Sequence, residues 1–259
     1  MLPIAGDHAP LKTADLVAGL KAGLAKHGVA ADVSAEGEIP QVTSLTIKLD
    51  RIATPKPTSK IAGDSSLRIE AFRIEGTPVF VEAVPIILDA RLSGVTAGFG
   101  KTDGNAWQLV VSAAREGSLL LETSVRDLEN GIHLTISALA SKQGATIKET
   151  KVQLTSSNPR SIHFNVACTA KVFIASATLS VAGQVDIDDQ LNARISGLSV
   201  KGDGMIANMA KGYLEPEIAK WNGRVVPLGD YIAAGLKVKD LRITAGEKAR
   251  LEAQFGAAS

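Results

Sequence analysis

Residues 161–189 read SIHFNVACTAKVFIASATLSVAGQVDIDD, and the alternation of apolar side chains in this stretch decides the fold class. Apolar residues occupy every even position from Ile162 to Ile174, and then odd positions from Ala175 to Ile187 except Gly183. A period of two is typical of β-strands, because successive side chains point to opposite faces of a sheet. Since no Gly or Pro stands at the junction, the change of phase predicts a β-bulge that bends one long strand, or two strands that exchange faces.

The same period continues on both sides of this stretch, from about residue 42 to residue 200, and predicts a series of antiparallel strands. AspGly at 103–104 and AsnGly at 130–131 are typical of hairpin turns. Further changes of phase occur at Ala71–Phe72 and at Ala83–Val84, and repeated bulges predict a strongly coiled sheet. The other apolar stripes are Trp107, Leu109, Val111 and Ala113; Leu119, Leu121, Thr123 and Val125; and Ile132, Leu134, Ile136 and Ala138.

Two segments have helical spacing instead. Residues 13–27 place Leu16, Val17, Leu20 and Leu24 at helical spacing, with Thr13 as a candidate N-cap and Gly28 as a candidate C-cap. A second helix is expected over about 203–221, where Pro216 should kink or restart it. Two alternating segments over about 235–255 then predict a closing hairpin. The order of helix, many strands, helix and hairpin predicts an α+β fold with a mainly antiparallel sheet, built as a single domain over residues 1–259.

Composition excludes several classes of function. The 28 basic and 27 acidic residues give a net charge of +1 without a block of one sign, so no nucleic-acid partner is expected. The single cysteine, Cys168, excludes an internal disulfide and a cysteine-based zinc site. Aromatic residues make up only 4% of the chain, so aliphatic and small side chains must fill the core or line a cavity.

Two glycine-containing stretches match nucleotide-binding motifs in spacing but not in context. GDGMIA at 202–207 follows an alternating strand, whereas a dinucleotide site needs a buried parallel strand in a βαβ unit. GFGKTDG at 98–104 leads into a hairpin, whereas a phosphate-binding loop must open a helix. We therefore expect no nucleotide cofactor, and Asp203 is interpreted as a helix N-cap.

The acidic and histidine residues show no metal-binding pattern. Residues 186–189, AspIleAspAsp, are not followed by the glycine and distal glutamate of a calcium loop, which favours a solvated hairpin end. None of the four histidines, His8, His27, His133 and His163, has a neighbour at ligand spacing, and no GxSxG motif occurs. The sequence thus predicts no metal, no catalytic residue and no enzyme, although a hydrolase with dispersed catalytic residues stays an alternative.

The N-terminus and one basic loop bear on location. MLPIAGDHAPLK has neither the charged nor the apolar region of a signal peptide, and no stretch is apolar enough to span a membrane. We expect a periplasmic or cell-envelope protein if a signal peptide was removed, and a cytoplasmic one otherwise. The loop KLDRIATPKPTSK carries Lys48, Arg51, Lys56 and Lys60, which suits either peripheral contact with a membrane or an ordinary solvated loop.

The C-terminal third carries a recognisable arrangement. The segment from Val172 to Trp221, the following VVPLGDY, and GLKVKDLRITAGEKARLEAQFG resemble bacterial members of the tubular lipid-binding (TULIP) superfamily, most of all the LmeA-like phospholipid-binding proteins. The shared features are a long sheet, a helix introduced by a glycine turn, a proline in that helix, a ProLeu segment and a hairpin of the form GLxVxDLRIxxG. The resemblance implies a highly coiled sheet wrapped around a long helix, with an apolar groove for acyl chains.

We therefore expect a lipid-binding or lipid-transfer protein whose partner is a phospholipid or another acyl lipid. The stripes of both helices and the sheet supply the expected lining of the groove. It comprises Leu16, Leu20, Leu24, Phe173, Leu179, Val181, Val185, Ile206, Met209 and Tyr213. The same stripes could instead fill a solid core, which would make the chain a non-catalytic structural or interaction domain.

Overall fold

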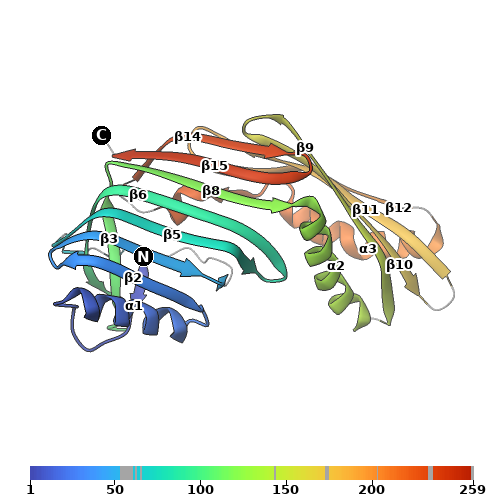
Figure 1. Cartoon of the computed structure of the whole chain (residues 1–259). Helices are drawn as coiled ribbons and strands as arrows, with labels where there is room; N and C mark the ends of the chain where they lie inside the picture. Colours follow the sequence, from blue (N-terminus) through green and yellow to red (C-terminus); the bar gives the residue numbers. More distant parts are fainter. Residues whose placement is uncertain are drawn as a thin grey trace. The chain divides into compact units, whose positions relative to one another are not determined.

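The computed structural model describes residues 1–52, 61, 63–64, 66–142, 144–172, 175–202, 204–232 and 236–257. The chain forms two compact units. Unit 1 comprises Met1–Leu121, Asp230–Leu241 and Leu251–Ser259, and unit 2 comprises Glu122–Gly229 and Arg242–Arg250. Strands dominate and helices are few, so the fold is α+β with large, mainly antiparallel sheets (Figure 1). No helix among the described residues is both long and apolar enough to cross a membrane.

The larger sheet has ten strands, seven of which follow the order β14-β15-β8-β6-β5-β3-β2. Most neighbours are antiparallel, but β3 and β4 run parallel to β5. Its strands are β1 (Leu2–Ile4), β2 (Ala31–Glu38), β3 (Gln41–Leu49), β4 (Arg51–Ile52), β5 (Leu67–Val81), β6 (Val84–Lys101), β7 (Trp107–Ala113), β8 (Glu116–Ser124), β14 (Leu236–Ala245) and β15 (Lys248–Ala257).

The core of unit 1 lies between this sheet and helix α1 (Thr13–Lys26). Leu16 and Leu20 are 0% exposed and pack with buried side chains of β3, β5, β6 and β7. Gly19 and Gly23 let β1 approach the helix, since a Cβ on Gly19 would lie 2.7 Å from Ile4 Cγ2 and one on Gly23 would collide with the Pro3 carbonyl. Burial of the leucine stripe and close packing at the glycines therefore hold α1 in place.

The predicted change of phase at Ala71–Phe72 is confirmed. The neighbouring strands β3 and β6 change phase at the same level of the sheet as β5. Buried residues in β5 change from Ile69 to Phe72, in β3 from Val42 to Leu45, and in β6 the buried Val95 follows Gly94, whose φ is +56°. Val42, Ile69 and Val95 are register partners. The three strands shift together, so the ladder keeps its register while the sheet bends along one line.

The change of phase at Ala83–Val84 has a different origin. Val81 pairs with Val84, so Glu82 and Ala83 form the tight turn that joins β5 to β6. The residue pair AspGly at 103–104 lies in the turn between β6 and β7, as predicted. The predicted strand range of about 42–200 omitted β1 and β2, which precede it.

Unit 2 is built on a five-stranded antiparallel sheet in the order β13-β12-β11-β10-β9. Two helices, α2 (Val125–Ser141) and α3 (Met205–Trp221), pack against it (Figure 1). The 3-10 helix η1 (Leu228–Tyr231) follows β13. The strands are β9 (Ala145–Asn158), β10 (Ser161–Val172), β11 (Ala175–Ile187), β12 (Asn192–Gly202) and β13 (Val225–Pro227).

The change of phase between residues 162–174 and 175–187 reflects a hairpin of β10 and β11, and not a bulge in one long strand. Val172 of β10 pairs with Ala175 of β11, so two residues connect the strands. Each even position of β10 therefore pairs with an odd position of β11, and partners in a ladder share a face of the sheet. The two apolar stripes thus form one continuous apolar surface.

The predicted strand over Ile132–Ala138 and the predicted AsnGly turn at 130–131 are wrong, because these residues lie in α2. Residues four apart on a helix share one face, and Leu128, Ile132, Ile136 and Ala140 are four apart and all even-numbered. This helical stripe therefore also satisfies the period of two that is typical of a strand. Ser124 favours the helix over the strand. It is the N-cap of α2, and its Oγ accepts a hydrogen bond from Asp127 N–H at 3.0 Å.

The remaining elements lie close to their predicted positions. The first helix ends where Gly28 has φ +73°, although Lys12, and not Thr13, is its N-cap. The second predicted helix is α3, which continues through Pro216, and the closing hairpin is β14–β15. Asp203, the expected N-cap of α3, lies outside the described residues, and Gly204 occupies the N-cap position of that helix.

Candidate functional site

The candidate site is the apolar face of the five-stranded sheet in unit 2, which we call the inner face. Register assigns residues to it from the four adjoining strands β9 to β12, because Val166 of β10 pairs with both Val152 of β9 and Val181 of β11. Val181 pairs in turn with Val200 of β12. The apolar members in these strands include Ile147, Val152, Leu154, Ile162, Phe164, Val166, Ala170, Ala177, Leu179, Val181, Val185, Ile195 and Val200.

Both helices of unit 2 lie on the inner face. Helix α2 packs against β9, and α3 packs against β12 and β11. At the start of α3, a Cβ on Gly202 would lie 3.0 Å from Ala207 Cβ and 2.7 Å from Leu179 Cδ2, which identifies the face that α3 covers. Gly183, in the middle of β11, leaves room for the ring of Phe164, whose Cζ would lie 2.8 Å from an added Cβ.

Polar contacts anchor α2 at the edge of this sheet. Glu129 Oε1 accepts a hydrogen bond from Val152 N–H at 2.8 Å, and so provides a partner for an amide of the edge strand β9. His133 Nδ1 lies 3.1 Å from Thr150 Oγ1, which lies 3.3 Å from Cys168 Sγ. The helix is therefore positioned by directional bonds as well as by its apolar stripe.

The inner face is less completely buried than the core of unit 1. Phe164, Val166, Leu179, Val181 and Val185 are half-buried. In unit 1, by contrast, the side chains of α1 and of the strands beneath it reach 0% exposure and form one connected core. Half-buried aliphatic side chains on one continuous surface leave apolar area on which a further apolar group could pack.

The predicted lining divides between the two units. Leu16, Leu20 and Leu24 belong to the core of unit 1, where they pack against its strands. Leu179, Val181 and Val185 lie on the inner face in unit 2. Ile206, Met209 and Tyr213 lie in α3, but their side chains are outside the described part of the structure, as is Phe173.

The prediction omitted the contribution of β9 and β10 to this face. Phe164, Val166 and Ala170 lie opposite Gly183, Val181 and Ala177 in the ladder. Their alternation was visible in the sequence, but only the pairing assigns them to the same surface as β11. The signal for β9 was weaker, because Lys148, Glu149 and Lys151 separate its apolar residues.

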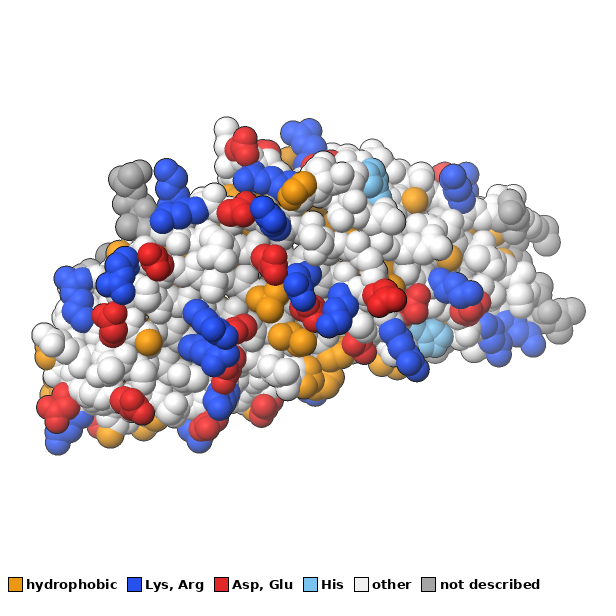
Figure 2. Space-filling view, turned by 45° about the horizontal axis from the view of Figure 1, so that its top comes forward, with side chains coloured by type: hydrophobic (Ala, Val, Ile, Leu, Met, Phe, Trp, Pro, Cys, Tyr) orange, Lys and Arg blue, Asp and Glu red, His pale blue; other side chains and the backbone are white. Residues whose placement is uncertain are grey.

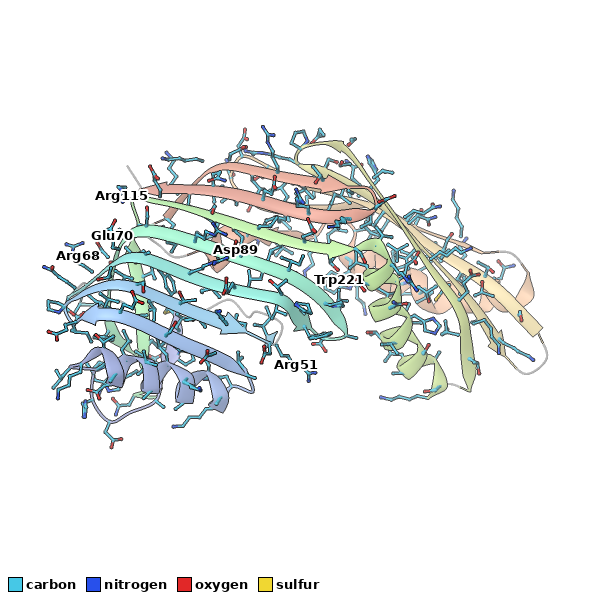
Figure 3. All side chains as sticks on the ribbon, in the orientation of Figure 1. Arg51, Arg68, Glu70, Asp89, Arg115 and Trp221 are labelled. Carbon is cyan, nitrogen blue, oxygen red and sulfur yellow. The ribbon has the colours of Figure 1, made fainter. Side chains whose placement is uncertain are left out.

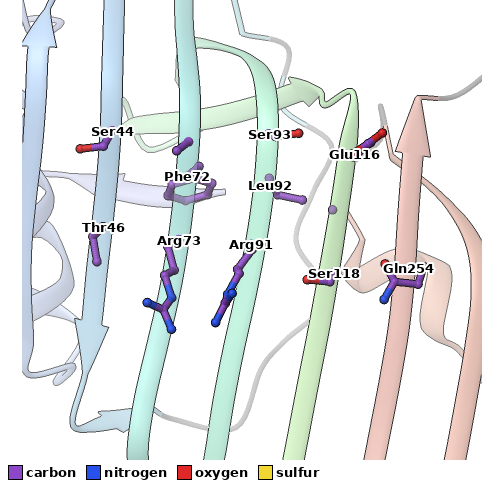
Figure 4. A pocket seen from close by; sticks show the side chains of 12 residues that line it. Ser44, Thr46, Phe72, Arg73, Arg91, Leu92, Ser93, Glu116, Ser118 and Gln254 are labelled. Atoms are coloured by element: carbon purple, nitrogen blue, oxygen red, sulfur yellow. The ribbon is translucent and has the colours of Figure 1, made fainter.

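A recess lies in unit 1, on the face of the larger sheet opposite the core (Figure 4). It has a volume of about 450 Å³, and its lining includes hydroxyl groups, Gln254 and the arginines of β5 and β6. Arg73 Nε donates to Asp89 Oδ1 at 3.0 Å, and Arg91 Nη2 donates to Asp89 Oδ2 at 2.6 Å. Hydrogen bonds from Arg91 and then Arg73 hold the pKa of Asp89 below its ordinary value. Both arginines are thus engaged by a carboxylate, and the lining combines these polar groups with the apolar side chains of Ala71, Phe72 and Leu92.

Acidic and basic side chains alternate over the surface shown in Figure 2. At one end of the larger sheet, Arg115 Nη2 lies 3.2 Å from Glu70 Oε1, near Arg68 (Figure 3). In the basic loop, Lys48 Nζ lies 3.5 Å from Glu75 Oε1 and Arg51 is exposed, whereas Lys56 and Lys60 fall outside the described residues.

The residues that match calcium-binding or nucleotide-binding motifs in part have local structural roles. Asp188 Oδ1 accepts hydrogen bonds from Gln190 N–H and Asn192 N–H in the β11–β12 turn, at 2.9 and 2.8 Å. These bonds, first that from Asn192, lower the pKa of Asp188. Gly202 ends an antiparallel strand, and Lys101 and Thr102 begin a hairpin turn. Across the parts of the chain that are described, no three His, Cys, Asp or Glu side chains come together as a metal site.

The chain was compared with protein-family models, curated proteins and solved structures, and it matches none of them.

Proposed function

We propose that this protein binds a lipid, and that the acyl chain packs against the inner face of unit 2. The observation that carries the proposal is the continuous apolar surface of β9–β12, whose central side chains are only half-buried although two helices lie on it. The free energy of a folded protein falls when exposed apolar area of this kind is covered. An acyl chain offers the matching chemistry.

The energetics suit an aliphatic ligand. Burial of an acyl chain contributes about 0.8 kcal/mol per CH₂ group, so a chain of roughly 16 carbons could gain on the order of 12 kcal/mol before ordering costs. Such binding needs no polar motif and no catalytic residue. The proposed partner is a phospholipid or another acyl lipid, in a non-enzymatic role of binding or transfer.

The proposal extends the TULIP resemblance to particular residues. Val166, Leu179, Val181 and Val185 would contact the acyl chain, while the predicted leucines of α1 stabilise unit 1. The further features that the resemblance implies, a sheet wrapped around a long helix and an exported protein of the cell envelope, are part of the proposal. The alternative, a structural or interaction domain, is supported by the closed core of unit 1.

Native mass spectrometry of the purified chain, followed by lipid extraction, tests the function most directly. We expect adducts with lipid masses, and uptake of a fluorescent fatty acid by protein from which lipid was removed. Protein from several hosts that carries no lipid, and that takes up neither labelled fatty acid nor labelled phospholipid, would contradict the proposal and favour the structural role.

A further inference from the structure

The proposed lipid site does not use the recess of unit 1 (Figure 4). The volume of this recess, about 450 Å³, falls within the roughly 300–1,000 Å³ of small-molecule sites. Its lining comes from β3, β5, β6, β8 and β15, and each of these strands has a sheet neighbour on both sides. Because their backbone groups bond within the sheet, a ligand in the recess must be recognised by side chains.

Two arginines of the recess belong to a cluster of charges. Arg73 and Arg91 are register partners in adjacent strands, where like charges destabilise a sheet. Asp89 accepts hydrogen bonds from both, and Glu75 lies 2.8 Å from Arg73 Nη2 and 3.5 Å from Lys48 Nζ. Three basic and two acidic side chains leave the cluster with a net positive charge, which favours an anionic ligand beside the arginines.

The ion pairs hold the arginines but do not use all of their donors. Arg73 and Arg91 each bind Asp89 through Nε and Nη2. Neither Nη1 has a hydrogen-bond partner among the residues that the structure describes. Each guanidinium is therefore oriented by Asp89 and keeps N–H groups with which it could bind a carboxylate or a phosphate.

The recess also offers groups that suit hydroxyl-rich ligands. Four of its hydroxyl side chains are half-buried and form no side-chain hydrogen bond within the described part of the chain: Ser44, Thr46, Ser93 and Ser118. The exposed Gln254 and Glu116 add an amide and a carboxylate. Hydroxyls and amides both donate and accept, so together these groups match the alternating donors and acceptors of a sugar.

The polar groups extend further than one sugar ring. They come from five adjacent strands, and four spacings of about 4.8 Å extend roughly 19 Å across the sheet. In the ladder, Ala71 lies between Ser44 and Ser93, and its short side chain leaves room between the two hydroxyls. The dimensions therefore suit a ligand of more than one ring, whose C–H groups could lie against the apolar part of the lining.

We propose that the recess binds a short acidic saccharide, one that carries a carboxylate or a phosphate. The anionic group binds Arg73 and Arg91, and the sugar hydroxyls bind the serine and threonine side chains, Gln254 and Glu116. This site is independent of lipid binding by unit 2, because it uses other residues and another class of ligand.

Isothermal titration calorimetry with the full chain tests the site. We expect digalacturonate or maltose 1-phosphate to bind at least tenfold more tightly than the neutral sugars galactobiose and maltose, and than acetate or inorganic phosphate. The comparison of digalacturonate with maltose 1-phosphate identifies which anionic group the arginines prefer. Neutral sugars that bind as tightly as the acidic ones, or acidic sugars that do not bind, would overturn the proposal, as would equal binding of acetate or phosphate alone.

Variants assign the binding to the recess. Arg91→Gln should weaken binding about tenfold, because a charge-assisted hydrogen bond is lost. Ala71→Tyr leaves the ion pairs intact and should abolish binding, because the ring would fill the space between Ser44 and Ser93. The matched control is Arg115→Gln, since Arg115 is similarly exposed and likewise ion-paired, with Glu70, but does not line the recess.

Unchanged affinity in both Arg91→Gln and Ala71→Tyr would contradict the site, and circular dichroism would check that both variants fold. Hydrogen exchange separates this result from the proposed function. The saccharide should protect β5 and β6 and leave β10 and β11 unchanged, and both variants should still take up fluorescent fatty acid. Protection confined to β10 and β11 would place the saccharide elsewhere and overturn the assignment to the recess.

Discussion

Gly23 and Gly212 both lie inside helices, but their surroundings are opposite. A Cβ on Gly23 would collide with the carbonyl of Pro3, whereas a Cβ on Gly212 would meet nothing within 4 Å. We expect Gly23→Ala to destabilise the protein by about 1–3 kcal/mol through overpacking. Gly212→Ala should stabilise it by up to about 1 kcal/mol, because alanine loses less backbone entropy in a helix. Urea denaturation of both variants would reveal this difference in sign.

At the inner face, Val181→Trp should reduce uptake of fluorescent fatty acid strongly, because the indole would occupy the area proposed for the acyl chain. Val181 is half-buried between Val166 and Val200 in the ladder. Thr178→Trp places the same side chain on the opposite face of β11, where Thr178 is exposed, and serves as the control. Equal uptake by Val181→Trp and by the wild type would remove this residue from the proposed site.

Asp89 makes unit 1 sensitive to acid. Its pKa is held below the ordinary value, mainly by the hydrogen bond from Arg91, so the charged form is favoured in the folded state. A depressed folded pKa contributes stability above the unfolded value of about 3.9 and loses it as the pH falls through the folded pKa. We therefore expect the stability difference between the wild type and Asp89→Asn to be constant at neutral pH and to shrink below about pH 4. Denaturation midpoints across this range, with Asp7→Asn as a control, provide the check.

At the scale of elements, the carboxylate of Glu129 contributes to the attachment of α2 to the edge strand β9. Glu129→Ala would leave the buried Val152 N–H without its acceptor, which should cost about 1–3 kcal/mol. Glu129→Gln keeps an oxygen at that position and should lose less. Urea denaturation and hydrogen exchange at the Val152 amide would measure the two effects. Equal losses in both variants would show that the bond contributes little and that α2 is held by its apolar stripe.

The same helix shows the limit of reasoning from periodicity. Ile132 and Ile136 fit a strand and a helix equally well, since both periods return to the same face after four residues. The 13–26 helix had no such ambiguity, because Leu16, Val17, Leu20 and Leu24 include odd and even positions. The closing hairpin was predictable because its strands are adjacent in sequence and alternate cleanly. Element type is therefore predictable where spacing distinguishes 3.6 from 2, and unpredictable where it does not.

At the scale of the whole molecule, hydrogen exchange with and without fatty acid should distinguish the two units. Ligand bound to the inner face stabilises the native state by RT ln(1 + [L]/Kd), about 2.7 kcal/mol at a ligand concentration of 100 Kd. We expect added protection in β10 and β11, and little change in α1. Protection of α1 alone would instead support the predicted leucine lining in unit 1.

The sequence by itself determined the α+β class, α1, α3, the closing hairpin and the apolar stripes, because these depend on local spacing and on turn residues. Only the tertiary structure decided which stripes share a surface. The pairing of β10 with β11 joined two phases into one face, and the leucines of α1 were assigned to the core of unit 1. The connection of β10 to β11 contains no Gly or Pro that would mark a turn in the sequence, and the packing of α1 joins residues far apart in the chain, so no local pattern contains either.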